Sequence, residues 1–437
     1  MKKSLIALAA LAATASFAQS SVTISGAVDV AYATRNVQAA DGSSIGKSSG
    51  VSEGQNTANR INFAMTEDLG GGMKAGAMVE TGLNITNGAL FSSRAGAAGI
   101  QVPNAAASIT PEIPVGAYTT ATNRQSYVFA NGDFGEVRAG YTRTNLYEQS
   151  TFSGYLVGQE QYGSLLHTLG NSVFGGTRGN GLTWITPSMN GFKATLQYGA
   201  GGDREVTTTD NTAGINGATN ATLKRTGIKI DYNNGPLNLA YGRTNVSAKT
   251  TLGTGGTQAG ILNIFNAVAS TSSPANADYN SNLNQFTGSY EVGALKVTGQ
   301  ILSGKRTTNI AVGTANNTTT PAIAMLSYLP AGAVTDYKAK VLGGIYTIGN
   351  VGLFASVGNG SIQNEGSATK LQDIKQQQVG VRYSLSKRTT LYAMTGTSKD
   401  TGVLVLANAT PLAAPAANGT STAAKATITG FGMAHSF

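Results

Sequence analysis

Few residues in this chain are of a type that could do catalytic or metal chemistry. The two histidines, His167 and His435, lie far apart, there is no cysteine, and no serine sits in a Gly-x-Ser-x-Gly elbow. The glycine-rich stretch GTGGTQAG lacks the preceding strand and following helix of a phosphate-binding loop. The sequence therefore predicts no enzyme, no cofactor and no metal site.

The charged residues are the remaining candidates for function, and they are sparse. They make up 12% of the chain, about half the usual share, and 57 glycines help to hold the apolar content at 41%. The formal charge is +9, or +7 without Lys2 and Lys3, which is too low a charge density for a nucleic-acid-binding protein. What the charged residues do must depend on the elements that hold them.

The first residues are typical of a secretory signal peptide. Lys2 and Lys3 precede an apolar run over residues 5–13, and small residues, Ser16 and Ala18, follow it. This run is too short to span a bilayer, and no later stretch approaches the roughly 18 continuous apolar residues of a transmembrane helix. We predict a signal peptide over residues 1–18 and one β-barrel domain over residues 19–437.

Alternation with a period of two dominates the rest of the chain. In QQQVGVRYSL, Val379, Val381 and Tyr383 share one face of a strand and polar residues share the other. TGIKIDYNNGPLNLAYG repeats the pattern as a hairpin, and similar pairs include RINFAMTEDLGGGMKAGAMVE, GLTWITPSMNGFKATLQYG and VGVRYSLSKRTTLYAM. Short turns join the strands of a pair, whereas long stretches rich in Gly, Thr, Asn and Ala join successive pairs.

The number and length of the strands indicate a membrane barrel. Seven hairpins, a first strand in SVTISGAVDVAYATR and a last strand in ATITGFGMAHSF give sixteen strands. Each strand has about 10 to 14 residues, which is longer than is usual in a soluble sandwich. Lipid forbids open sheet edges, so the first and last strands must pair. We predict an all-β fold, a sixteen-stranded antiparallel transmembrane β-barrel with short periplasmic turns and long extracellular loops.

The quoted segments resemble the general porins of Gram-negative outer membranes, in particular the beta-proteobacterial type. SSVTISGAVDVAY resembles the first strand of that family, TEDLGGGMKAG its second periplasmic turn, FGEVRAG its fifth strand, and RGNGLTWITPSMNGF its sixth strand and following turn. The alternating residues Phe431, Met433, His435 and Phe437 resemble the signal that the outer-membrane β-barrel assembly machinery recognises. The resemblance covers essentially the whole mature chain.

The resemblance implies a homotrimer that crosses the lipid of the Gram-negative outer membrane many times. A third long loop, here about residues 146–177, would fold into the pore. Arginines would line the pore constriction, and the positions that match those of the family are Arg60, Arg124, Arg138 and Arg178. Glu148 and Glu160 fall in the inward loop, where they are either an acidic wall opposite the arginines or ordinary exposed carboxylates.

Strand alternation also places Arg60, Arg124 and Arg138 inside. Their apolar neighbours are expected to face lipid; these are Ile61 and Phe63, Tyr127 and Phe129, and Val137 and Ala139. Lysines on polar faces are expected to make the lumen more positive; they are Lys74, Lys193, Lys229, Lys296, Lys338 and Lys340.

Two features argue against a strongly basic constriction. The arginines could be paired with acids such as Glu80, Glu136 or Asp29 and so be mostly neutralised. Where the family often has a second arginine after EVRAG, this chain has Tyr141. Arg143 follows two residues later and is expected on the opposite face of the strand from Arg138.

The function predicted from the sequence is passive diffusion. We expect an outer-membrane porin whose water-filled channel admits small hydrophilic solutes and ions and favours anions. A surface adhesin or binding protein that uses the barrel as an anchor and a substrate-specific channel are the two alternatives.

Overall fold

The computed structural model describes residues 20–38, 44–53, 56–83, 85, 124–152, 178–206, 219–252, 277–310, 333–401 and 424–437. The predicted signal peptide lies outside these ranges. Within them the chain forms seventeen strands, each antiparallel to its neighbours, and the helix α2 (Asn145–Phe152). None of the helical segments in the described ranges is long and apolar enough to cross a membrane.

The strands follow one another along the chain as β1 (Ser21–Gln38), β2 (Ser44–Glu53), β3 (Arg60–Gly70), β4 (Met73–Gly82), β5 (Gln125–Gly132), β6 (Gly135–Arg143), β7 (Arg178–Ile185), β8 (Phe192–Val206), β9 (Thr219–Asn234), β10 (Leu237–Leu252), β11 (Ala277–Val292), β12 (Leu295–Ile310), β13 (Ala333–Ile348), β14 (Val351–Asn364), β15 (Lys370–Ser384), β16 (Thr389–Asp400) and β17 (Ala424–Ser436).

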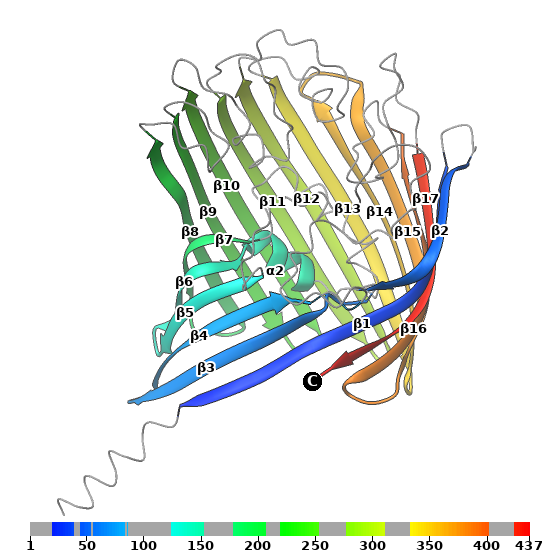
Figure 1. Cartoon of the computed structure of the whole chain (residues 1–437), viewed down its shortest axis with the longest axis horizontal. Helices are drawn as coiled ribbons and strands as arrows, with labels where there is room; N and C mark the ends of the chain where they lie inside the picture. The colour runs from blue at the N-terminus through cyan, green and yellow to red at the C-terminus, as the bar shows by residue number, and fades with distance from the viewer. Residues whose placement is uncertain are drawn as a thin grey trace, which may run out of the picture.

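The sheet closes on itself to form a barrel (Figure 1). One edge of β1 pairs with β17, from Ala27 opposite Ser436 to Gln38 opposite Lys425. The other edge of β1 pairs with β3 over residues 21–27 and with β2 over residues 30–38. Because β2 and β3 share one position beside β1, the seventeen strands fill sixteen positions around the barrel. The predicted sixteen-stranded barrel and its closure by the last strand are confirmed.

The barrel wall is low on one side and tall on the other (Figure 1). Strands β3 to β7 have 8 to 11 residues, whereas β8 to β15 have 14 to 16. At one edge of the barrel, tight turns join the strands, and Gly235 and Gly293 adopt positive φ angles of 57° and 56° there. Glycine takes this conformation without steric cost, so these turns can be short.

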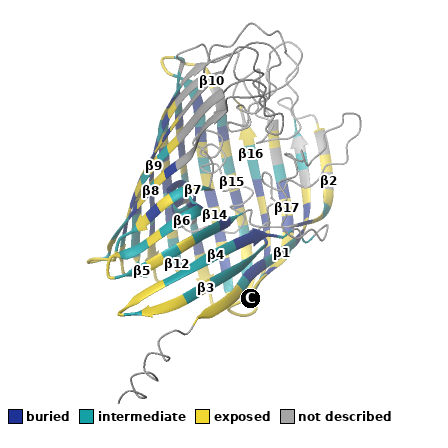
Figure 2. Ribbon diagram, turned by 60° about the vertical axis from the view of Figure 1, so that its left-hand side comes forward, coloured by how far each residue is buried: buried dark blue, intermediate teal, exposed yellow. Residues whose placement is uncertain are grey.

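The outer face of the barrel is apolar. Large exposed side chains include Ile24 on β1, Val128 on β5, Leu342 on β13 and Phe431 on β17. Exposed and buried residues alternate along strands of the tall wall such as β14, as Figure 2 shows by colour. An apolar outer belt on a closed sheet is what a lipid environment requires.

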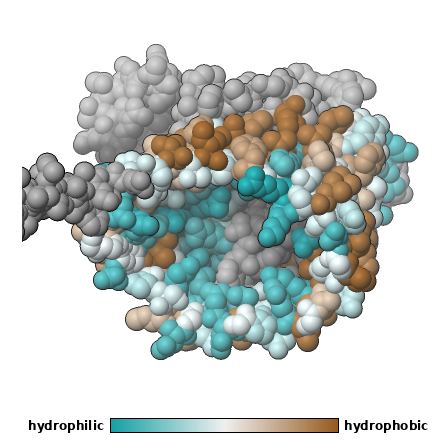
Figure 3. Space-filling view, turned by 90° about the horizontal axis from the view of Figure 1, so that it is seen from below, coloured by the Kyte–Doolittle hydropathy of each residue, from teal (hydrophilic) through white to brown (hydrophobic). Residues whose placement is uncertain are grey.

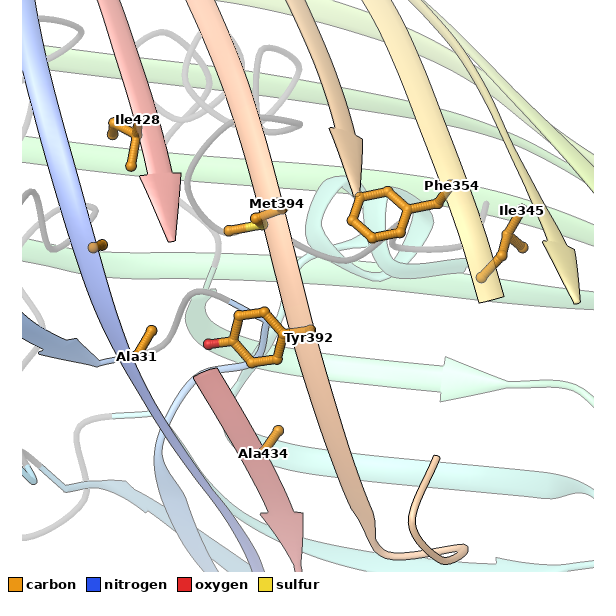
Figure 4. Close-up of a cluster of buried hydrophobic side chains, with 8 residues drawn as sticks. Ala31, Ile345, Phe354, Tyr392, Met394, Ile428 and Ala434 are labelled. Atoms are coloured by element: carbon orange, nitrogen blue, oxygen red, sulfur yellow. The ribbon is translucent and has the colours of Figure 1, made fainter. Parts of the chain in front are cut away.

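The inner face is less polar than predicted on one side of the barrel. Ile345, Phe354, Tyr392, Met394 and Ile428 are buried and point inward from β13, β14, β16 and β17 (Figure 4). The expectation that the inner face is polar to charged is therefore wrong at these residues. Both faces of β13 carry apolar residues, so hydrophobic alternation could not assign its faces.

Candidate pore constriction

Glu80, near the end of β4, is one of the almost fully buried acids of the inner wall. Only 1% of its side chain is exposed, and it forms an ion pair with Nε of Arg124. Nη2 of Arg143 lies 3.0 Å from Oε2 of Glu80, and Nε2 of Gln125 donates to the same oxygen at 2.5 Å. One carboxylate therefore holds two arginines and an amide together on the low wall.

The two arginines reach Glu80 because they stand at strand ends. Gln125 lies directly opposite Glu80, so the inner face of β5 carries Gln125, Tyr127 and Phe129. The assumption that Tyr127 and Phe129 face lipid is wrong. Arg124 precedes β5 and Arg143 ends β6, where alternation no longer fixes the direction of a side chain.

A second group of charges surrounds Arg138 on β6. Its Nε is paired with Glu136, and its guanidinium carbon lies 5.0 Å from the centroid of the Tyr127 ring. Nη1 of Arg138 is 3.9 Å from Oε1 of Glu148 on α2, and Oε2 of Glu148 is 3.3 Å from Nζ of Lys229 on β9. Glu148 thus bridges basic groups from the low wall and the tall wall.

Helix α2 lies inside the barrel against β9, β10 and β11 (Figure 1). Nε2 of Gln149 donates to the backbone oxygen of Gln285 at 3.1 Å, and the backbone N–H of Asn145 donates to Oε1 of Gln197 at 2.8 Å. The wall has a glycine, Gly242, where a Cβ would overlap the amide of Gln149. The first part of the predicted inward loop therefore does lie in the lumen; residues 153–177, with Glu160, are outside the described ranges.

Arg60 opens β3 and points inward, as predicted. Its Nη1 donates to the backbone oxygen of Ala58 at 2.9 Å and to Oγ1 of Thr57 at 3.0 Å. The buried carboxylate of Asp29 accepts the backbone N–H groups of Asn56 and Thr57, both at 2.6 Å. The segment that carries Arg60 is therefore fixed to the inner face of β1.

The outcomes for the predicted residues differ from one another. Arg60 and Arg138 lie inside, as strand alternation predicted. Arg124 lies inside because it precedes β5 and is paired with Glu80. Arg178 is the first residue of β7 and lies opposite Arg143, and its side chain is outside the described part of the structure.

Sequence reasoning missed several inward arginines, among them Arg143, Arg225 and Arg306; Arg306 is buried on β12. Strand alternation predicts that Arg143 points outward, and no local pattern signals that its side chain bends inward to Glu80. Arg225 on β9 shares the inner parity of Lys229 and lies against Gly179, so alternation could have found it.

Four of the six lysines expected in the lumen lie on the inner face, namely Lys74, Lys193, Lys229 and Lys296. Lys338 and Lys340 lie on the outer face, because Lys340 is directly opposite Ile301, an outer residue that is 58% exposed. The expectation for these two lysines is wrong.

The described part of the lumen is lined by charged and polar side chains. Seen from the end with the short turns, the molecule is hollowed, and mainly hydrophilic residues line the opening (Figure 3). Near α2, basic and acidic groups alternate within a few ångströms of each other. Such an arrangement can bias the passage of ions, and in the described part of the chain it contains no cluster of three metal-binding side chains.

Comparison with known proteins gives consistent matches. The family of Gram-negative porins matches residues 5–328. The Outer membrane porin protein 32 of Delftia acidovorans is 33% identical over 250 residues, which are 55% of this chain and 59% of that protein. The match therefore spans less than two thirds of the length of this relative.

Two solved structures share the fold. An anion-selective porin from Comamonas acidovorans superimposes with a TM-score of 0.60 at 21% identity, over 96% of this chain and 100% of that chain. A loop-deletion mutant of OmpT, an outer membrane protein of Vibrio cholerae, gives a TM-score of 0.52 at 13% identity over 96% and 99% of the chains.

Proposed function

The chain belongs to the Gram-negative porin family, and we propose that it forms a water-filled channel for passive diffusion of small hydrophilic solutes and ions, with a weak preference for anions. Family membership confirms the prediction of a β-barrel of the outer membrane and the prediction that the protein is not an enzyme. The observation that carries the proposal is the group of arginines and glutamates on β3 to β6, opposite a helix that lies inside the barrel.

The preference for anions is proposed to be small because the charges are nearly balanced. The basic groups near the proposed constriction are Arg60, Arg124, Arg138, Arg143, Arg225 and Lys229, and the acidic groups there are Asp29, Glu80, Glu136, Glu148 and Asp231. The excess is about one positive charge. At about 6 Å from a passing ion it contributes roughly 0.7 kcal/mol in water, and screening halves this value. The expected preference for anions is about twofold.

The porin from Comamonas acidovorans is anion-selective, which is the selectivity proposed for this chain. Because the two chains are 21% identical, the likeness supports the shared fold, and the proposed selectivity of this chain rests on its own charges.

Reversal-potential measurements test the channel and its selectivity. The purified protein in a planar bilayer should give steady single-channel conductance. In a KCl gradient of about tenfold, the sign of the reversal potential should show that chloride is more permeant than potassium. The preference should fade near 1 M salt, where the Debye length falls to about 3 Å. A silent bilayer would overturn the channel and favour a barrel-anchored binding protein, and a cation preference would overturn the role of the arginines.

We further propose that the protein assembles as a homotrimer, as is typical of the family. A closed barrel holds its backbone hydrogen bonds internally, so a detergent gel should preserve the oligomer until it is boiled. Migration as a monomer before heating, with the sheet signal retained, would contradict the trimer.

A further inference from the structure

A row of lysines crosses the outer face of the barrel from β13 to β17. Lys375 on β15 lies directly opposite Lys399 on β16, and Lys399 lies opposite Lys425 on β17. On its other side Lys375 is opposite Asn359 of β14, which is opposite Lys340 of β13. Neighbouring strands are about 4.8 Å apart, so this lysine belt, Lys340, Lys375, Lys399 and Lys425, extends over about 19 Å.

The lysine belt faces away from the lumen. Strand alternation places Lys340 on the same face as Leu342, which is 58% exposed, and Lys425 on the same face as Phe431, which is 64% exposed. All four lysines of the belt are exposed. They therefore point toward the surroundings of the barrel.

The belt places its four positive charges on the outer face within five neighbouring strands. Like charges directly opposite each other destabilise a sheet. No ion pair joins a belt lysine to another residue in the described ranges; the nearby outer acids bridge other lysines. Asp336 lies 4.0 Å from Lys305, Glu365 is also paired with Lys305, and Asp373 lies 3.0 Å from Lys370.

The belt lies at the upper margin of the apolar outer surface. Leu342 lies two residues below Lys340, on the side of the short turn that follows β13, and Val379 lies four residues below Lys375. With strands tilted by about 40°, the lysines stand about 20 to 30 Å above the edge with the short turns. This height corresponds to the top of an apolar band about 25 Å tall, where lipid headgroups begin.

We propose that the lysine belt binds a lipid headgroup with two phosphate groups in the outer leaflet of the membrane. Lysine is a point-charge ligand for phosphate, and an anion placed between facing lysines removes their mutual repulsion. A row about 19 Å long accommodates more than one phosphate. The inference rests on the membrane placement of the barrel and does not depend on conduction or ion selectivity.

Lipid binding to purified variants tests the belt. The probe is diphosphoryl lipid A, titrated in detergent micelles and followed by native mass spectrometry, with fully dephosphorylated lipid A as the comparison. The variant Lys375→Gln/Lys399→Gln removes two belt charges. The control, Lys224→Gln/Arg243→Gln, removes two exposed outer charges from β9 and β10, away from the belt.

The belt variant should bind diphosphoryl lipid A about 25-fold more weakly at low salt, since each surface lysine contributes about fivefold. The control variant and the dephosphorylated lipid should show no such difference. Equal weakening in both variants, or full competition by inorganic phosphate, would overturn the proposal. A belt variant that loses its oligomeric state while it binds the lipid normally would make the belt a protein interface, which also overturns the proposal. The reversal potential of the belt variant checks the channel separately.

Discussion

At the scale of single residues, the proposed constriction is organised around buried acids. Glu80 is almost fully buried and serves Arg124, Arg143 and Gln125 at once. Burial of a carboxylate costs free energy unless charged and hydrogen-bonding partners offset the loss of water. Glu80 therefore acts as a positioning residue that keeps two arginines beside the pore while reducing their net charge.

Replacing Glu80→Gln should separate these two effects. The variant leaves Arg124 and Arg143 without their shared carboxylate, so we expect the free energy of unfolding to fall by about 3 kcal/mol. It also removes one negative charge, so the preference for anions at low salt should rise by a further factor of about two. Urea unfolding in detergent and reversal potentials measure the two quantities.

The variant Glu136→Gln provides the control. Glu136 is 26% exposed and is paired with Arg138, so its replacement should shift selectivity in the same direction at a cost of less than about 1 kcal/mol. If the two variants lost equal stability, the burial of Glu80 would not be what organises the site.

Alternation of side chains predicted part of the site and failed at particular residues. Arg60 and Arg138 lie within or at the start of regular strands, and their inward direction follows from the period of two. Arg124 and Arg143 flank strands, so their direction depends on Glu80, a contact between segments that are far apart in sequence. Aromatic residues occur on both faces, which is why Tyr127 was assigned to lipid.

At the scale of elements, glycines on the tall wall make room for helix α2. Gly242 on β10 and Gly227 on β9 face the helix, and a Cβ on either would approach Gln149 or Asn145. A hydrogen bond from Gln149 to the backbone of Gln285 then fixes the helix to the wall. The inward loop was expected from family resemblance, whereas its docking through small residues was not visible in the sequence.

The variant Gly242→Val should displace α2 from the wall. The new side chain overlaps the amide of Gln149, so the helix must move toward the pore axis, and we expect a lower and noisier single-channel conductance. Gly299→Val on β12 is the control, because a Cβ there has nothing within 4 Å. Wild-type conductance in both variants would show that the position of α2 does not limit the current.

At the scale of the whole molecule, the fold was predictable because one pattern recurs in most of the strands. Long strands with apolar faces, joined by alternating short and long connections, allow little besides a closed membrane barrel. The extra strand β2 was not predicted, since it shares a position with β3 and does not change the count around the barrel. Closure itself depends on the pairing of β17 with β1, which no local pattern specifies.

The pairing of β1 with β17 forms the closing seam of the barrel, and this seam ends at Phe437. The backbone N–H of Gly26 donates to the oxygen of Phe437 at 2.9 Å, and the N–H of Phe437 donates to the oxygen of Gly26 at 3.2 Å. The ring of Phe437 lies over Gly26 on the outer face, where a Cβ would overlap it. Phe431, Met433 and His435 share this face, as expected of an assembly signal, and that role remains a proposal.

Deleting Phe437 should therefore reduce the amount of assembled barrel far more than it alters the conductance of barrels that do assemble. The deletion removes two hydrogen bonds and the ring from the seam, while the ring is remote from the lumen. Phe437→Ala keeps the backbone bonds and removes the ring, and Phe437→Tyr keeps both. If recognition of the ring matters, Phe437→Ala should assemble as poorly as the deletion and Phe437→Tyr should assemble normally. Heat-modifiable protein in outer-membrane fractions measures assembly, and normal amounts of the deletion variant would show that the seam closes without Phe437.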